Sequence, residues 1–346
     1  MLYVSTKSKT DFYTAHRALH NRFAGDGGMF VPFHLVTIEP EQLAAWKGKS
    51  AGEAIALILN GFFGLSLTGW DVEYAIGRTP FRAVAMNRRI TVAECWRSIS
   101  GSWDKIVRNL HICMGCRDTV AADIQGWVRI AIEIAILFGI YAQIDDDGTG
   151  TFDICVAGGN FATVAAALYA KDMGLPVGKI LCVCNENSGF WDLIHRGEFN
   201  TGLAVIKTAL SELDITRPRY LEYLIHRAFG IEGVKQYLDA CDKNGVFYLD
   251  EDMEVRLTDE LLTAVSSSSR VDAVISSLYR TNGYIADPVT ALIYGGLQDY
   301  RASSGVSNHT LLLAKDSPLD SSSTVAQALG ITRNELIKQI NSPRSK

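Results

Sequence analysis

The sequence lacks three features that would each indicate a whole class of protein. It has no excess of positive charge, because 33 Lys and Arg face 38 Asp and Glu for a net charge of −5, and this argues against nucleic acid or an anionic membrane surface as partner. Its longest apolar run, residues 130–138, contains Glu133 and is too short to span a membrane. Its first residues have no apolar signal-peptide core. We therefore expect a cytoplasmic protein whose partners are small molecules or other proteins.

Disulfide bonds are also not expected. The chain has seven cysteines, an odd number for 346 residues, and a protein of this size does not need disulfides to hold its core. Apolar residues make up 48% and charged residues 21% of the sequence, which is typical of a folded protein of one large or two medium domains. We expect reduced thiols in an enzyme-sized globular chain.

The clearest structural pattern lies between residues 152 and 184. Residues 152–157 form a short apolar run typical of a buried strand, 161–173 predict a helix, and 180–184 predict the next strand. A strand, loop, helix and strand in this order indicate an α/β protein with a mostly parallel sheet. The remaining patterns predict helices at 51–63, 124–144, 221–242, 259–281 and 288–300, and a last strand at 311–314.

A glycine-rich loop joins the first of these strands to its helix. Gly158, Gly159, Asn160, Phe161 and Ala162 follow one another there, and such a loop directs backbone N–H groups and the positive end of a helix dipole at one point. We interpret the loop as a phosphate-binding site. The alternative is a tight turn that needs its glycines for backbone reasons alone. Arg129 is a further candidate for binding an anion, with an ordinary salt bridge as the alternative.

The residues around this loop carry a resemblance to a known family. The stretch from Gly159 through residues 170–176 to Asn187 resembles the threonine synthase family, and so do four segments elsewhere, at 3–7, 26–32, 126–130 and 284–294. Members of that family are pyridoxal-phosphate (PLP) enzymes of fold type II, which convert O-phosphohomoserine and water into threonine and phosphate. The resemblance implies a fold type II α/β architecture with a reduced small domain. It divides the chain into an N-terminal region at 1–90, a remnant of the cofactor-covering domain at 91–123 and a large domain at 124–346.

The sequence departs from the family pattern where the cofactor would be bound. The family motif that supplies the Schiff-base lysine matches residues 94–105, but it places Asp104 at the lysine position and Lys105 one residue later. A carboxylate cannot form an imine, and neighbouring side chains point in different directions. Few residues stand between Lys105 and Gly126, where the family inserts most of its small domain. Lys315 replaces a threonine that approaches the pyridine nitrogen in the family.

Three hypotheses follow. In the first, PLP-dependent catalysis is lost, no cofactor is expected, and the cleft binds a phosphorylated or carboxylated small molecule. Asp104, Lys105, Lys315 and Cys113 are then the candidate acid, base or nucleophile. In the second, the chain is a catalytically inactive pseudoenzyme that binds a partner protein or a second copy in a homodimer, because loss of the covering domain exposes apolar surface. In the third, Lys105 still holds PLP.

Two cysteine pairs and an acidic segment are candidate metal sites. Cys113 and Cys116, with His111 nearby, could form half of a metal or redox site, but no second such pair follows. Cys182 and Cys184 are taken to face opposite sides of a strand. Structural thiols and no metal are therefore expected. The acidic segment at 145–150 lacks the later glutamate of a calcium loop and is interpreted as a solvated turn.

Overall fold

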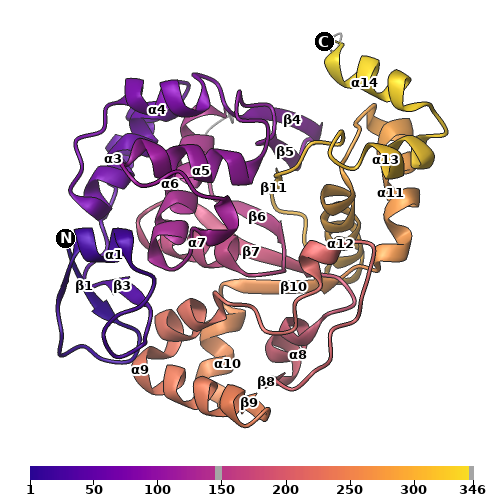
Figure 1. Cartoon of the computed structure of the whole chain (residues 1–346). Helices are drawn as coiled ribbons and strands as arrows, with labels where there is room; N and C mark the ends of the chain where they lie inside the picture. The colour runs from indigo at the N-terminus through magenta and orange to yellow at the C-terminus, as the bar shows by residue number, and fades with distance from the viewer. Residues whose placement is uncertain (145–149, 343–346) are drawn as a thin grey trace.

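A six-stranded sheet forms the centre of the molecule in the computed structural model, which describes residues 1–144 and 150–342 (Figure 1). The strand order is β10-β7-β6-β11-β5-β4, and β4 alone runs antiparallel to its neighbour. This confirms the expected α/β class with a mostly parallel sheet. The strands are β4 (Arg82–Asn87), β5 (Ile90–Glu94), β6 (Phe152–Ala157), β7 (Val177–Cys184), β10 (Leu261–Val265) and β11 (Thr310–Ala314).

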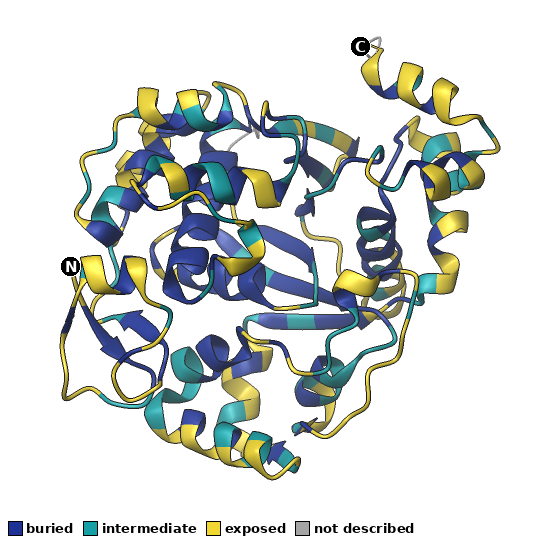
Figure 2. Cartoon of the chain, viewed as in Figure 1, coloured by how far each residue is buried: buried dark blue, intermediate teal, exposed yellow. Residues whose placement is uncertain are grey.

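Two layers of helices cover the two faces of the sheet. Side chains alternate along a strand, so on β6 Ile154 and Val156 enter one core while Cys155, between them, enters the other. The first core also contains α3 (Ala51–Phe63), α6 (Trp127–Gln143) and α7 (Ala162–Asp172), and the second contains α11 (Val271–Asn282), α12 (Pro288–Ser304) and α13 (Ser322–Leu329). Figure 2 shows that α6, α7 and the central strands are almost wholly buried. Burial on both faces explains why the strand sequences are continuously apolar.

The N-terminal region forms a separate small sheet beside this core. Its strands β1 (Leu2–Ser5), β2 (Tyr13–Thr14) and β3 (Phe30–Pro32) pair antiparallel in the order β2-β1-β3. The other elements are α1 (Ala15–His20), α2 (Pro40–Trp46), α4 (Gly69–Ile76), α5 (Trp103–Cys113), the 3-10 turn η1 (Ala121–Asp123), α8 (Gly189–Arg196), β8 (Glu198–Asn200), η2 (Ser211–Leu213), α9 (Leu221–Asp242), β9 (Val246–Tyr248), α10 (Glu251–Thr258), η3 (Ser268–Arg270) and α14 (Arg333–Asn341).

The expected helix at 259–281 is wrong in its first half. Residues 261–265 form the edge strand β10, which pairs in parallel with β7, and the helix α11 begins only at Val271. A short apolar run has the same appearance in a buried strand and in a buried helix, so only the pairing with β7 distinguishes them. The predicted strands at 152–157, 180–184 and 311–314 are confirmed.

The expected division of the chain at residue 90 falls at the first residue of β5. Strands β4 and β5 belong to the same sheet as β6 and β11, so the polypeptide before residue 90 contributes to the central sheet as well as to the N-terminal one. The acidic turn expected at 145–150 lies, except for Gly150, outside the described residues. None of the helices in the described ranges has the length and apolarity that a membrane span requires.

Candidate functional site

The glycine-rich loop is held in place by contacts from outside its own sequence. Phe161 has a left-handed backbone with φ of 67°, which is unfavourable for a residue with a side chain. Its ring is buried against Phe190, with 4.5 Å between ring centroids, and this packing offsets the unfavourable conformation. The Asn160 side chain accepts a hydrogen bond from the Ala162 N–H at 3.0 Å, and the Asn160 carbonyl accepts one from the Tyr220 N–H at 3.1 Å. The loop is therefore a fixed start for α7.

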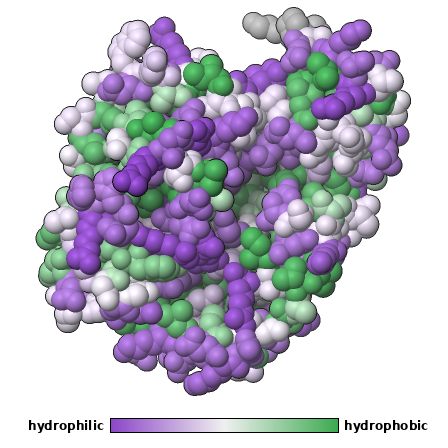
Figure 3. Space-filling view, in the orientation of Figure 1, coloured by the Kyte–Doolittle hydropathy of each residue, from purple (hydrophilic) through white to green (hydrophobic). Residues whose placement is uncertain are grey.

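The loop opens onto the main cavity, which has a volume of about 600 Å³. The cavity lies at the carboxyl ends of β6 and β11, where open α/β sheets usually bind ligands. Its wall comes from Gly158–Asn160, the start of α5, one face of α6, the segment 212–220 and the residues after β11. In Figure 3 the middle of this face is hollowed, with hydrophobic residues inside and hydrophilic residues around them.

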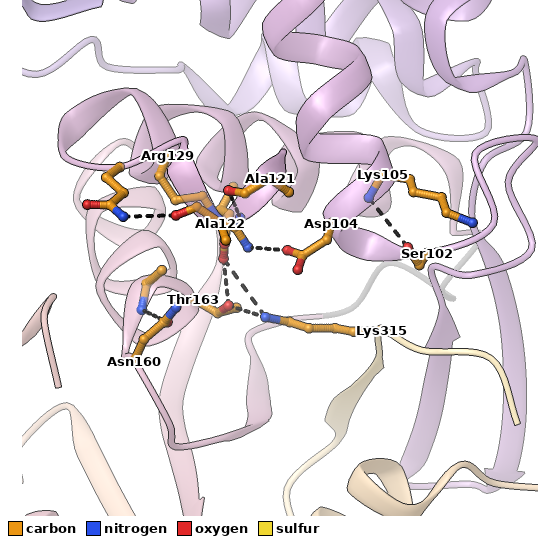
Figure 4. Close-up of polar contacts among 12 residues, drawn as sticks. Ser102, Asp104, Lys105, Ala121, Ala122, Arg129, Asn160, Thr163 and Lys315 are labelled. Atoms are coloured by element: carbon orange, nitrogen blue, oxygen red, sulfur yellow. Dashed lines mark hydrogen bonds and ion pairs between the residues drawn. The ribbon is translucent and has the colours of Figure 1, made fainter. Parts of the chain in front are cut away.

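Glu133 is the centre of a polar network in the wall of this cavity. Figure 4 labels the residues that surround it, Arg129, Thr163 and Lys315. One carboxylate oxygen accepts a hydrogen bond from Arg129 Nε at 2.5 Å, and the other accepts one from Thr163 Oγ1 at 2.5 Å. Lys315 Nζ donates to Thr163 Oγ1 and lies 3.9 Å from the Glu133 carboxylate. The same ammonium stands over the ring of Trp103, 4.5 Å from its centroid. Strands and helices far apart in sequence are thus joined by one buried carboxylate.

The charges of this network determine its protonation. Burial alone would raise the pKa of Glu133, but Lys315 and Arg129 together leave that pKa below its ordinary value. Burial alone would lower the pKa of Arg129, but Glu133 and then Asp104 raise it. Asp316 differs, because burial, with a smaller contribution from Asp104, raises its pKa to about 6 despite the nearby Lys315. The cavity therefore holds an ion pair, Arg129 with Glu133, whose charged forms are favoured, beside one carboxyl group with a pKa close to neutral pH.

Asp104 and Lys105 are neighbours in sequence but not in the site. Asp104, in the first turn of α5, accepts a hydrogen bond at 2.7 Å from Arg129 Nη2 and lines the cavity. Lys105 is exposed and points away from the network, as Figure 4 shows, and its own backbone N–H bonds to Ser102. Lys105 does not line the cavity. Adjacent positions on a helix project about 100° apart, which is the reason for the difference.

Cys113 also lies away from the main cavity. It is at the far end of α5 and contacts the Asp71 carbonyl oxygen at 3.5 Å. Burial raises its pKa, which disfavours the reactive thiolate. The structure thus brings Asp104, Lys315, Arg129, Gly158, Gly159 and Asn160 together around one cavity, whereas Lys105 and Cys113 stand apart.

The cysteines form no metal site within residues 1–144 and 150–342, where the structure shows no group of three or more potential metal ligands. Cys182 and Cys184 lie in the same hydrophobic core. The expectation that they face opposite sides is wrong, because residues two apart in a strand share a face.

Several residues of the site were missed in the sequence. Glu133 was noted only as a charge inside an apolar run, and Thr163, Trp103, Asp316 and Arg219 were not singled out. The spacing of Arg129 and Glu133, four residues apart on a predicted helix, is a recognisable ion-pair signal. A glutamate within an otherwise apolar helix that carries a preceding arginine could have indicated Glu133. The other residues come from distant segments and had no local signal.

Comparison with known proteins agrees with the fold. A family model described as the threonine synthase N terminus matches residues 2–79. The chain is 27% identical over 179 residues to threonine synthase-like 1 of Homo sapiens, which covers 50% of this chain and 24% of that protein. It is 27% identical over 267 residues to the threonine synthase of Eremothecium gossypii, covering 71% of this chain and 52% of the relative. The match therefore spans about a quarter to a half of these relatives.

Solved structures extend the likeness to the whole fold. The structure of PLP-bound threonine synthase from Brucella melitensis superposes with a TM-score of 0.83 at 19% identity, covering 100% of this chain and 95% of that one. Threonine synthase from yeast gives a TM-score of 0.82 at 16% identity, covering 99% and 94%. At these identities the superpositions establish the fold alone. Together, these comparisons show that the N-terminal region matches the threonine synthase family model, that the chain is similar to threonine synthases and threonine synthase-like proteins over part of its length, and that it has the threonine synthase fold.

Proposed function

We propose that the main cavity binds a small molecule carrying a phosphate or carboxylate group and acts on it without PLP. The observation that carries this proposal is the ion pair between Asp104 and Arg129, 2.7 Å long. The resemblance assigns the position of Asp104 to the lysine that would bond to the cofactor. A carboxylate cannot form that bond, and here it is occupied by the Arg129 guanidinium.

The residues around the cavity do not fit PLP at its other end either. Lys315 stands where the resemblance places a threonine beside the pyridine nitrogen, and its ammonium opposes the protonation of that nitrogen by charge repulsion. Lys315 is also the only lysine among the described residues that line the cavity. Its Nζ is engaged by Thr163 and lies 3.9 Å from Glu133. We therefore derive no step that uses PLP.

The cavity offers an anionic ligand three kinds of contact. The loop at Gly159 and Asn160 presents backbone N–H groups at the start of a helix, which suits a phosphate or carboxylate; the Gly158 N–H bonds to the Val183 carbonyl oxygen. Arg217 and Arg219 also line the cavity, on the segment that bonds to the loop through Tyr220, and contribute positive charge. The Lys315 ammonium can stabilise negative charge that develops on a bound oxygen. Asp316, with its pKa of about 6, can accept or donate a proton near neutral pH.

A second candidate, a catalytically inactive binding subunit, is favoured by the completeness of the network. Asp104, Arg129, Glu133 and Lys315 are already neutralised by one another, which is typical of a structural ion-pair cluster. An exposed aromatic pair on α4, Trp70 at 82% and Tyr74 at 90%, then provides apolar surface for a partner protein or for a homodimer.

The proposal is tested first by its cofactor prediction. Purified protein mixed with PLP should show no visible absorption band of a Schiff base, and later reduction of that mixture with borohydride should add no cofactor mass to Lys105 or Lys315. A mass increase on Lys105 would support the third hypothesis, and one on Lys315 would contradict the role given to it here.

Ligand binding is the second part of the test. Calorimetry with O-phosphohomoserine and with inorganic phosphate should detect binding that Asn160→Ala weakens, because this variant frees the start of α7. Asn282→Ala is the matched control, since its side chain bonds to the Met86 carbonyl outside the cavity. Binding followed by chemical change of the ligand, detected by phosphorus NMR, supports an enzyme, and binding without change supports the inactive subunit. Equal binding by both variants contradicts the site.

A further inference from the structure

A second cavity lies where the chain passes from α5 to α6. It has a volume of about 610 Å³, and we call it the junction cavity. Its wall comes from residues 19–22 at the end of α1, from His111 and residues 115–119 at the end of α5, and from residues 123–128. Residues 123–125 also line the main cavity, so the link before α6 separates the two.

Positive and protonatable side chains dominate this wall. His20, Arg22, His111 and Arg117 line the junction cavity against a single carboxylate, Asp123. Within the part of the chain that the structure describes, neither Arg22 nor Arg117 forms an ion pair with a carboxylate. Cations that outnumber the carboxylates of a concave site create a positive potential that attracts anions.

Buried polar atoms without hydrogen-bond partners lie in the same wall. They are Arg22 Nε, His111 Nδ1 and Gln125 Oε1. Leaving such an atom unpaired destabilises the folded protein, and buried polar groups are nearly always paired in native proteins. Two of the three atoms belong to side chains that donate hydrogen bonds when protonated, which is the set that an anion would satisfy.

The pKa shifts of Arg22 and His111 also indicate a cavity that lacks negative charge. Burial lowers the pKa of Arg22, and Arg219 at the rim of the main cavity lowers it further. Burial also lowers the pKa of His111, with His20 adding to the effect. Each protonated form is therefore destabilised by its surroundings, and an anion placed among them would reverse the sign of that effect.

We propose that the junction cavity is a second ligand site, which binds a small phosphate-bearing anion through Arg22, His111 and Arg117. Phosphate matches this donor set because guanidinium groups bind its oxygens in a fork. The site is independent of the glycine-rich loop. Because the link at 123–125 faces both cavities, an occupant here would contact the wall of the main cavity.

Isothermal titration of the full chain with pyrophosphate tests this site. The wild type should bind, and Arg22→Gln and Arg117→Gln should each weaken the affinity by at least about tenfold, because each removes a charge-assisted hydrogen bond. Arg108→Gln is the matched control. It also removes one positive charge, but Arg108 is on α5, pairs with Asp118 and does not line the cavity. This variant should retain the wild-type affinity.

Further measurements distinguish loss of binding from loss of folding and separate the two sites. Thermal unfolding of each variant establishes that it is folded, and His111→Gln, which keeps a side-chain amide donor, replaces any variant that is not. Asn160→Ala should leave pyrophosphate binding unchanged, which separates this site from the one proposed at the loop. The proposal is overturned if the wild type binds no pyrophosphate, if the control weakens binding as much as the two arginine variants, or if only Asn160→Ala abolishes it.

Discussion

The main cavity and the junction cavity lie on either side of one short link, yet they differ in whether their buried polar groups have partners. In the main cavity, Glu133 is bonded to Arg129 and Thr163 and faces Lys315, so the buried charges satisfy one another. In the junction cavity, Arg22 and His111 each keep a buried nitrogen without a partner. The first arrangement holds the protein together by itself, and the second is complete only with an anion. The predictions below test this contrast.

The largest effect is expected from Glu133→Gln. This change removes the buried negative charge that Arg129 and Lys315 share and leaves Arg129 paired with Asp104 alone, so the free energy of unfolding should fall by about 3–5 kcal/mol. Urea unfolding followed by circular dichroism measures it. The control is Glu232→Gln, because Glu232 pairs with Lys235 on the surface and its loss should cost about 0–1 kcal/mol. Equal losses in the two variants would show that the network does not hold the structure.

A pH effect of a few kcal/mol is expected from Asp287, the N-cap of α12. Burial, with a smaller contribution from Asp316, raises its pKa from 3.8 to about 7. Between these two values the folded carboxyl keeps a proton that the unfolded chain has released, so stability falls as the pH rises through that window. Asp287→Asn, which retains the cap, should lose on the order of a few kcal/mol of this dependence. Urea midpoints across the pH range measure it, and identical slopes for both proteins would contradict it.

The separation of the two cavities predicts an effect of about tenfold on binding. Lys315→Met should weaken the binding of O-phosphohomoserine by about that factor, because an ammonium contact to an anion is lost. It should leave the affinity for pyrophosphate unchanged, and Arg22→Gln should do the reverse. Calorimetry of both variants with both ligands measures the four values. If each variant weakens the binding of both ligands equally, the two cavities act as one site.

The smallest effect is expected on the reactivity of a thiol. Cys116 lines the junction cavity, and burial raises its pKa to about 11, so it should react slowly with iodoacetamide. Pyrophosphate should slow this reaction further, by a few-fold at ligand saturation. Cys241, another half-buried thiol with a pKa raised by burial, lies outside both cavities and is the control. Mass spectrometry of labelled peptides measures both rates, and equal protection of the two thiols would argue against a local effect.

The sequence predicted the parts of the fold that depend on local pattern. The strand at 152–157, the loop and the helix after it are confirmed, because an apolar run followed by glycines and a helical period is readable within a few residues. The sequence pattern favours a helix where edge strand β10 lies, since its four apolar residues and one threonine carry no period of their own. The same limit applies to the site: Asp104 and Lys315 were predicted, whereas Glu133 and Thr163, which join them, were not.

The sequence by itself determined that a glycine-rich loop begins a buried helix and that a carboxylate stands where the resemblance expects an amine. Only the tertiary structure decided that Asp104 meets Arg129, that Lys315 meets Thr163, and that Arg22 and His111 share a cavity. The physical reason is that periodicity reports which face of an element is buried. Periodicity does not report which other element packs against that buried face. This depends on packing between segments far apart in the chain.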